Sequence, residues 1–115
     1  MEKNEIMELV TEDAGKLVGG IRRAGERHRR EVFCGAKSVV RDEFYGAARS
    51  GMNASIILVV DRDEFEEASL YRDGRKIRPK EAFYDGTPYR ILRTYQAPGS
   101  GDLELTCGEI EGVGP

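Results

Sequence analysis

The side chains best suited to covalent chemistry are two cysteines and one histidine. Cys34 and Cys107 are the only cysteines in the 115 residues, and His28 is the only histidine. A cysteine nucleophile needs a base within hydrogen-bond reach, and the one imidazole lies in an arginine-rich stretch. Cysteine at an alternating strand position is more often a small buried apolar side chain. We therefore predict that neither cysteine is catalytic.

Gly15-Lys16 is the only stretch that resembles a phosphate-binding loop. Such a loop would need glycine where Val10 stands and serine or threonine where Leu17 stands. Both positions are wrong, so an ordinary turn is the better interpretation. We predict no nucleotide cofactor.

The sequence patterns do not fit a metal site either. The segment Asp61–Glu67 begins like a calcium loop, but Phe65 and Glu66 occupy positions that need an aspartate or asparagine and a glycine. It is therefore expected to be a solvated acidic turn. Two cysteines and one histidine do not complete a four-ligand zinc site within one subunit. We predict no metal and, with no catalytic constellation in view, no enzymatic activity.

Charge is distributed unevenly along the chain. The range 21–30 holds five arginines and one glutamate, whereas the ranges 1–15 and 61–67 each hold five acids and one cation. Stretches of opposite sign suit association between subunits better than contact with DNA, and the overall charge of −3 argues against a general nucleic-acid binder. Contact with packaged DNA is kept as an alternative. The predicted partner-contact patch comprises Arg22, Arg23, Arg27, Arg29 and Arg30.

The longest uninterrupted apolar run is Ile56–Val60, far below the ~18 residues of a membrane-spanning helix. The acidic start of the chain lacks the basic region of a secretory signal. We expect an intracellular chain without membrane contact, in which Cys34 and Cys107 form no disulfide.

Periodicity predicts mostly short strands. Glu5–Thr11 fits a strand or a short helix equally well, whereas the period of two after Glu31 indicates a strand. The apolar run ending at Val60 predicts a strand covered on both faces. Asp73-Gly74 and Asp85-Gly86 are hairpin-type turns. The side chains predicted to be largely buried are Val32, Cys34, Ile57, Val59, Ile91, Leu103 and Leu105.

A helix of two to three turns is predicted from Asp42, a good N-cap, to Gly51, a good helix stop. Together these elements predict a single domain over residues 1–115. We expect a small, mainly β barrel with a helical excursion, residues 41–53, between two early strands. An N-terminal strand and basic connection occupy 1–30, and 112–115 is a loose tail.

Two stretches carry a family resemblance. Glu31–Met52 reads as a Val-Phe-Cys strand, a Ser-Val pair and a Glu-Phe-Tyr-x-Ala-Ala helix that ends at glycine. Tyr84–Tyr95 reads Y-x-G-x-x-Y-x-I-x-R-T-Y and is followed by the Leu-x-Leu strand of Asp102–Leu105. In this order and spacing, the chain resembles the head-closure, or head–tail adaptor ("stopper"), proteins of long-tailed bacteriophages and prophages.

The resemblance implies a structural role. Such proteins are small β-barrels that form rings beneath the portal and its adaptor ring after DNA packaging, close the channel and offer a platform to the tail. It implies a chain that is made in the host cytoplasm and ends in the virion. The ring is expected to be a dodecamer that matches the portal, although the isolated chain is expected to be a monomer. On the tail side, the expected partner is a tail-completion or tail-tube protein. A tail-completion role in the same assembly is not separated from head closure.

By position, the family's long excursion corresponds to Arg41–Asn53. Two adjacent aromatic residues cannot both point inward from one narrow helical face, so at least one is expected to contact a neighbouring subunit or the ring lumen. The alternative is that both cap the barrel. The predicted excursion contacts are Asp42, Phe44, Tyr45, Arg49 and Met52.

A different class of function also fits a small barrel. An OB-like or SH3-like module binds nucleic acid or peptide through exposed strand aromatics in a positive groove. Tyr84, Tyr89 and Tyr95, with Arg90 and Arg93, have suitable residue types. The alternation predicts that Tyr89, Ile91, Arg93 and Tyr95 share one strand face, with Ile91 making that face partly core.

Overall fold

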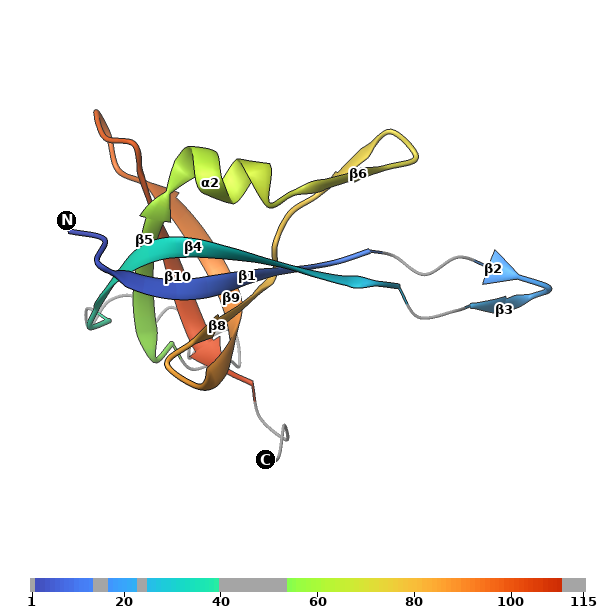
Figure 1. Cartoon of the computed structure of the whole chain (residues 1–115), viewed down its shortest axis with the longest axis horizontal. Helices are drawn as coiled ribbons and strands as arrows, with labels where there is room; N and C mark the ends of the chain where they lie inside the picture. Colours follow the sequence, from blue (N-terminus) through green and yellow to red (C-terminus); the bar gives the residue numbers. More distant parts are fainter. Residues whose placement is uncertain (1, 14–16, 23–24, 40–53, 111–115) are drawn as a thin grey trace.

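A computed structural model describes residues 2–13, 17–22, 25–39 and 54–110 (Figure 1). In chain order the elements are β1 (Glu5–Glu12), β2 (Leu17–Val18), β3 (Ile21–Arg22), β4 (Arg27–Lys37), β5 (Ile56–Asp61), α2 (Arg62–Glu67), β6 (Leu70–Arg72), β7 (Arg75–Ile77), β8 (Glu81–Tyr84), β9 (Thr87–Gln96) and β10 (Asp102–Glu109). The predicted helix within 41–53, and every excursion contact assigned to it, lie outside the described residues.

Six strands close into an antiparallel barrel in the order β1-β4-β5-β10-β9-β8, with β8 returning to pair with β1. Each of the six strands thus pairs with two neighbours. The predicted mainly β barrel is thereby confirmed. Glu5–Glu12 forms a strand rather than a helix because its alternate residues Met7 and Leu9 enter the barrel core.

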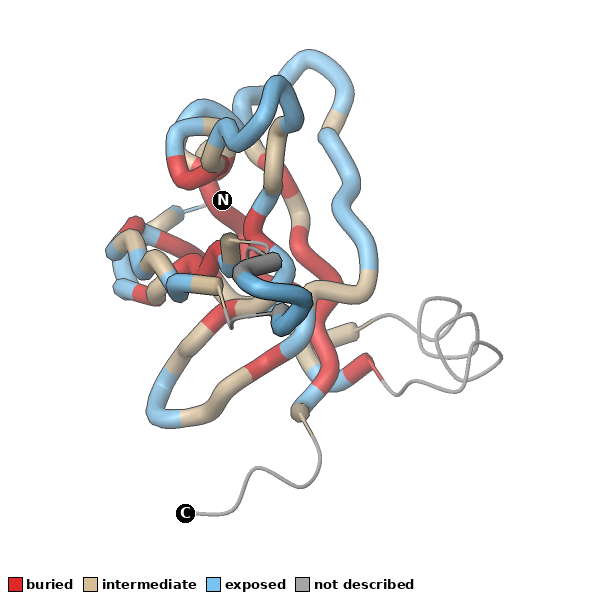
Figure 2. The backbone as a smooth tube through the Cα atoms, turned by 90° about the vertical axis from the view of Figure 1, so that its right-hand side faces the viewer, coloured by how far each residue is buried: buried red, intermediate tan, exposed pale blue. Residues whose placement is uncertain are grey.

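The barrel core is built from inward-facing residues of all six strands. Met7 lies opposite Val32, and Leu58 lies between Ala36 and Leu105. Figure 2 shows the buried positions running along the barrel strands, with exposed positions at the surrounding loops. The core cluster comprises Met7, Leu9, Val32, Cys34, Leu58, Val60, Phe65, Ala68, Ala82, Tyr89, Leu103, Leu105 and Cys107.

Six of the seven predicted core side chains are buried, and the seventh, Ile91, packs against the core while partly exposed. Ile57 and Val59 are buried on the outer face of β5, because Leu58 and Val60 are the residues that enter the barrel. The prediction that this strand is covered on both faces is therefore confirmed. An ion pair between Lys37 of β4 and Glu104 of β10 (2.9 Å) spans that outer face.

The two hairpin turns predicted from Asp-Gly are also confirmed. Asp73 and Gly74 have φ of 52° and 75°, and Asp85 and Gly86 have φ of 49° and 77°. Positive φ at both central residues defines the two-residue turn that matches strand twist, and glycine takes it without steric cost. These turns form the hairpins β6–β7 and β8–β9.

The acidic turn predicted over Asp61–Glu67 is wrong, because α2 occupies this segment. The Asp61 side chain accepts a hydrogen bond from the Asp63 backbone N–H, which caps the helix, and Asp63 and Glu64 lie in its first turn. Phe65 is 3% exposed and belongs to the barrel core. The helix thus closes one end of the barrel, across which it lies in Figure 1.

Beyond the barrel, the described residues between β1 and β4 form an arm, here defined as Asp13, residues 17–22 and residues 25–26. Its base is held by the Asp13 N–H, which donates to the Glu26 carbonyl (2.8 Å), and its outer part is the β2–β3 ribbon. Figure 1 shows this ribbon far from the barrel. The arm accounts for the molecule's long axis of 48 Å, against 29 and 26 Å for the others.

Candidate interaction surfaces

The structure places both cysteines in the barrel core. Cys34 and Cys107 are fully buried free thiols, and burial raises their pKa to about 11 and about 12 respectively. A thiol with such a pKa is almost entirely protonated near neutrality, so it is a poor nucleophile. His28 lies six residues before Cys34 on the same strand, about 20 Å away at strand rise, which is too far for a base.

The acidic segment 61–67 uses its carboxylates within the fold. Asp61 caps α2, Glu66 forms an ion pair with Lys76, and Glu64 and Glu67 face Arg30. Over the described ranges, no group of three or more histidine, cysteine or acidic residues is arranged to hold a metal ion.

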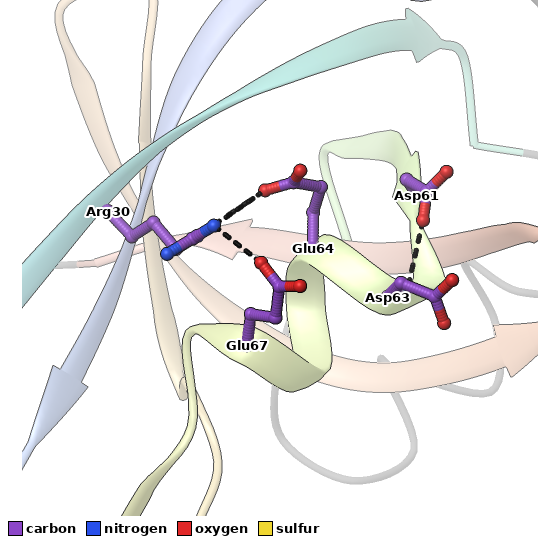
Figure 3. A network of polar contacts seen from close by, with 5 residues as sticks. All are labelled: Arg30, Asp61, Asp63, Glu64 and Glu67. Carbon is purple, nitrogen blue, oxygen red and sulfur yellow. Dashed lines mark hydrogen bonds and ion pairs between the residues drawn. The ribbon is translucent and has the colours of Figure 1, made fainter.

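Arg30 projects toward α2 rather than outward. Its Nη2 lies 3.1 Å from Glu64 Oε2 and 2.7 Å from Glu67 Oε2, as Figure 3 shows. The position follows from register, because Arg30 lies opposite the buried Leu9 and so points to the core side of β4, where α2 caps the barrel. One member of the predicted basic patch therefore serves as a bridge inside the molecule.

Arg27 and Arg29 lie on the outer face and are also paired. Arg27 donates through both terminal nitrogens to the Glu81 carboxylate (3.2 Å each), with Glu12 3.7 Å away, and its pKa is raised chiefly by the hydrogen bond to Glu81. Arg29 lies 3.8 Å from Glu8 and over the Phe83 ring. Arginines of the same chain thus partly neutralise the acidic range 1–15, at Glu8 and Glu12.

Arg22 lies in β3, on the arm, and Arg23 falls outside the described residues. The four arginines that the structure describes are therefore not gathered into one patch. Arg30 faces α2, Arg27 and Arg29 line the outer face of β4, and Arg22 is at the arm. That these arginines contact a partner stays a prediction.

A patch that sequence reasoning did not single out lies on the outer face of β1 and β4. Ile6 and Phe33 are directly opposite each other and are 51% and 64% exposed. Glu8 and Glu31 form the next outward-facing pair. We call these four residues the Ile6–Phe33 face. The sequence contains a signal for this face. In a strand with a period of two, burial of Val32 and Cys34 points Phe33 outward.

The tyrosines of the alternative binding module do not form a platform. Tyr89 is buried, and burial is the main cause that raises its pKa. Tyr84 donates a hydrogen bond to Glu5 (2.6 Å), which is the main cause that raises its pKa to about 12. Only Tyr95, at 51% exposure, is open among the three.

The expected shared face of β9 is also wrong. Cys107 pairs with Ile91 and Thr106 with Arg93, so Leu92 is an extra residue at a bulge. The extra residue reverses the alternation. Tyr89 and Ile91 therefore face the core side, whereas Arg93 and Tyr95 lie opposite the outward-facing Thr106 and Glu104.

No helix among the described residues is long and apolar enough to cross a membrane. No protein-family model matches the chain, and no curated protein matches it in sequence.

Proposed function

We propose that this chain is a structural connector protein of a tailed bacteriophage or prophage, which forms a ring beneath the portal and its adaptor, closes the head channel after packaging and joins head to tail. The proposal starts from the resemblance carried by Glu31–Met52 and Tyr84–Tyr95. The fold agrees with the small barrel that the resemblance implies.

One observation gives the proposal its main structural support: a closed barrel whose β1–β4 hairpin extends outward as an arm and carries an exposed apolar pair. Because every barrel strand already pairs with two others, contacts with neighbouring subunits are expected to use side-chain faces and projecting segments. Exposed apolar side chains of adjacent strands are typical of protein–protein contacts. A subunit that contacts its neighbours in a ring needs such a projecting segment and such an exposed apolar surface.

The binding-module alternative has weaker support. Stacking bases on a sheet requires several exposed aromatic residues within a positive groove. Tyr89 is buried and Tyr84 is bonded to Glu5, so Tyr95 is the one open tyrosine of the three named for this module. A titration with single-stranded DNA at low salt checks this alternative, and tight binding would favour it over the connector proposal.

The test disrupts the gene in the phage or prophage that encodes the chain and counts particles by electron microscopy after induction. We expect DNA-filled heads without tails, or heads that have lost their DNA, together with free tails. A plasmid copy of the intact gene should restore tailed particles. Normal yields of tailed, infectious particles without the protein would contradict the proposal.

The excursion is tested in the same complementation assay. Phe44→Ser with Tyr45→Ser should yield packaged heads that leak DNA or take no tails, while the purified variant stays folded. If the purified variant unfolds instead, the two aromatic residues belong to the core and the excursion does not make the contact.

A further inference from the structure

Residues 75–80, which run from β7 to the start of β8, are strongly cationic. They contain no acidic residue and four cations: Arg75, Lys76, Arg78 and Lys80. Lys76 forms an ion pair with Glu66. The other three are exposed and have no ion-pair partner among the described residues. We call this stretch the 75–80 segment.

The arginines of β4 are used differently. Arg27, Arg29 and Arg30 each lie within ion-pair distance of a carboxylate of the same chain. An exposed cation without such a partner is the one that is free to bind an anion from another molecule. Over the part of the chain that the structure describes, the 75–80 segment is therefore a better candidate for anion contact than β4 is.

The first cation of the segment also lies beside another positive charge. Arg72 and Arg75 are directly opposite each other in the β6–β7 hairpin. Like charges directly opposite each other on neighbouring strands are destabilising. Arg72 donates through Nε to the Asp13 carboxylate (2.9 Å), whereas Arg75 has no ion-pair partner among the described residues. An anion bound at Arg75 would relieve the repulsion.

The backbone that carries these cations is held at both ends. The ion pair between Lys76 and Glu66 ties the hairpin to α2, beyond which it projects in Figure 1. At the other end, the Lys80 N–H donates to the Val10 carbonyl (3.2 Å), and the Lys80 carbonyl accepts from the Ile91 N–H (2.8 Å). Cations on a backbone that is already ordered lose less conformational entropy when they bind.

The exposed side chains of the segment are all cationic, because Ile77 is partly buried and Pro79 is buried. The cores of protein–protein interfaces are depleted in charged residues, whereas interfaces with nucleic acid are much more positively charged. The Ile6–Phe33 face, with its exposed apolar pair, has the character of a protein contact. The 75–80 segment has the character of a phosphate contact.

We propose that the 75–80 segment binds the phosphate backbone of duplex DNA through Arg75, Arg78 and Lys80. Five residue steps of extended chain span up to about 17 Å, enough to follow successive phosphates along one strand. Contacts of this kind are independent of base sequence. The inference rests on the proposed function for the source of the DNA, which is the packaged genome in the head channel.

Fluorescence anisotropy of a labelled DNA duplex tests the contact with the purified full-length chain. Three phosphate contacts predict a slope of about −2.7 for log Kobs against log salt concentration, so affinity should fall about 40-fold between about 50 and 200 mM salt. Arg75→Gln with Arg78→Gln removes two contacts, so the slope should fall to about −0.9. No binding at about 0.1 mM chain in about 50 mM salt would overturn the proposal.

The matched control is Lys37→Gln with Arg62→Gln. These side chains are 43% and 53% exposed, lie on β4 and α2, and their removal costs the same net charge. The slope of this variant should equal that of wild type. If both double variants lower the slope equally, binding depends on net charge alone and the placement on the 75–80 segment is overturned.

Two further titrations compare other binding modes. Poly-glutamate at the same charge concentration should displace less labelled duplex than unlabelled duplex does, and equal displacement would overturn DNA in favour of an acidic protein. Single-stranded DNA of the same length should bind no more tightly than duplex, because its charge density is lower. Tighter single-strand binding that is lost in Arg90→Gln would place the contact on the outer face of β9 and overturn the proposal.

The outcomes separate this inference from the proposed function. Duplex binding that needs Arg75 and Arg78, in a chain that is absent from phage particles, supports the phosphate contact and removes the connector function. A chain at the head–tail junction whose duplex binding does not change with these two substitutions overturns the phosphate contact and leaves the connector function standing.

Discussion

Leu105 is the clearest case of a side chain whose role was predictable. Its alternation with Glu104 and Thr106 placed it inside, and it is fully buried opposite Leu58. Leu105→Ala leaves a cavity in the barrel, so we expect the free energy of unfolding to fall by about 2–5 kcal/mol. Urea denaturation measures this. Tyr71→Ala, at an exposed position, is the control and should change little.

The two cysteines support a prediction about reactivity. Both thiols are buried, with pKa raised to about 11 for Cys34 and about 12 for Cys107. We expect negligible reaction with a thiol reagent in the native protein near neutrality and two reactive thiols per chain after unfolding. A non-reduced sample whose mass lacks two free thiols would contradict the prediction that no disulfide forms.

Tyr84 makes stability depend on pH in the alkaline range. Its hydrogen bond to Glu5 raises its pKa from 10 to about 12, so the folded state holds the phenolic proton more tightly than the unfolded state does. That contribution is complete below pH 10 and is lost as the pH rises through about 12. Tyr84→Phe should therefore be less stable than wild type below pH 10, and the difference should narrow above it. A constant difference across thermal melts up to pH 12 would contradict this.

At the scale of elements, α2 shows why some of the fold was missed. The high acid content of 61–67 favours a solvated turn, yet Asp61 and Glu64 have the spacing of a helix N-cap and its third residue. The single apolar residue, Phe65, was the other signal. Six residues are too few for a helical period to be evident, so the helix depends on the barrel beneath it.

Phe65 and Arg30 are expected to contribute very differently to holding α2. Phe65→Ala removes a buried aromatic ring and should lower stability by about 3–5 kcal/mol. Arg30→Ala breaks the ion pairs with Glu64 and Glu67. Because the arginine side chain is 42% exposed, we expect a loss of at most about 1 kcal/mol, less at high salt. Urea denaturation at low and high salt compares them. If Arg30→Ala costs as much as Phe65→Ala, the cap is held by charge rather than by packing.

Local sequence patterns predict neither the bulge at Leu92 nor the pairing of β1 with β8. Period-two alternation in β9 was correct up to Ile91 and failed after it, because one inserted residue reverses every later side chain. Barrel closure depends on contacts between residues about 75 positions apart, such as Glu8 with Phe83, which no local pattern specifies.

At the scale of the whole molecule, the fold class was predictable and the interaction surfaces largely were not. Short strands separated by Asp-Gly turns indicated a compact β domain. The arm was not foreseen, because β2 and β3 are only two residues each and leave no periodic signal. The basic stretch was interpreted as one patch, and its arginines lie on different faces because strand alternation separates Arg30 from Arg29.

A cryo-electron microscopy reconstruction of the head–tail junction in purified particles tests most directly whether the chain is part of the head–tail connector, as we propose. We predict a ring of small six-stranded barrels beneath the portal and adaptor. Infectious particles whose junction is resolved and contains no copy of this barrel would contradict the claim.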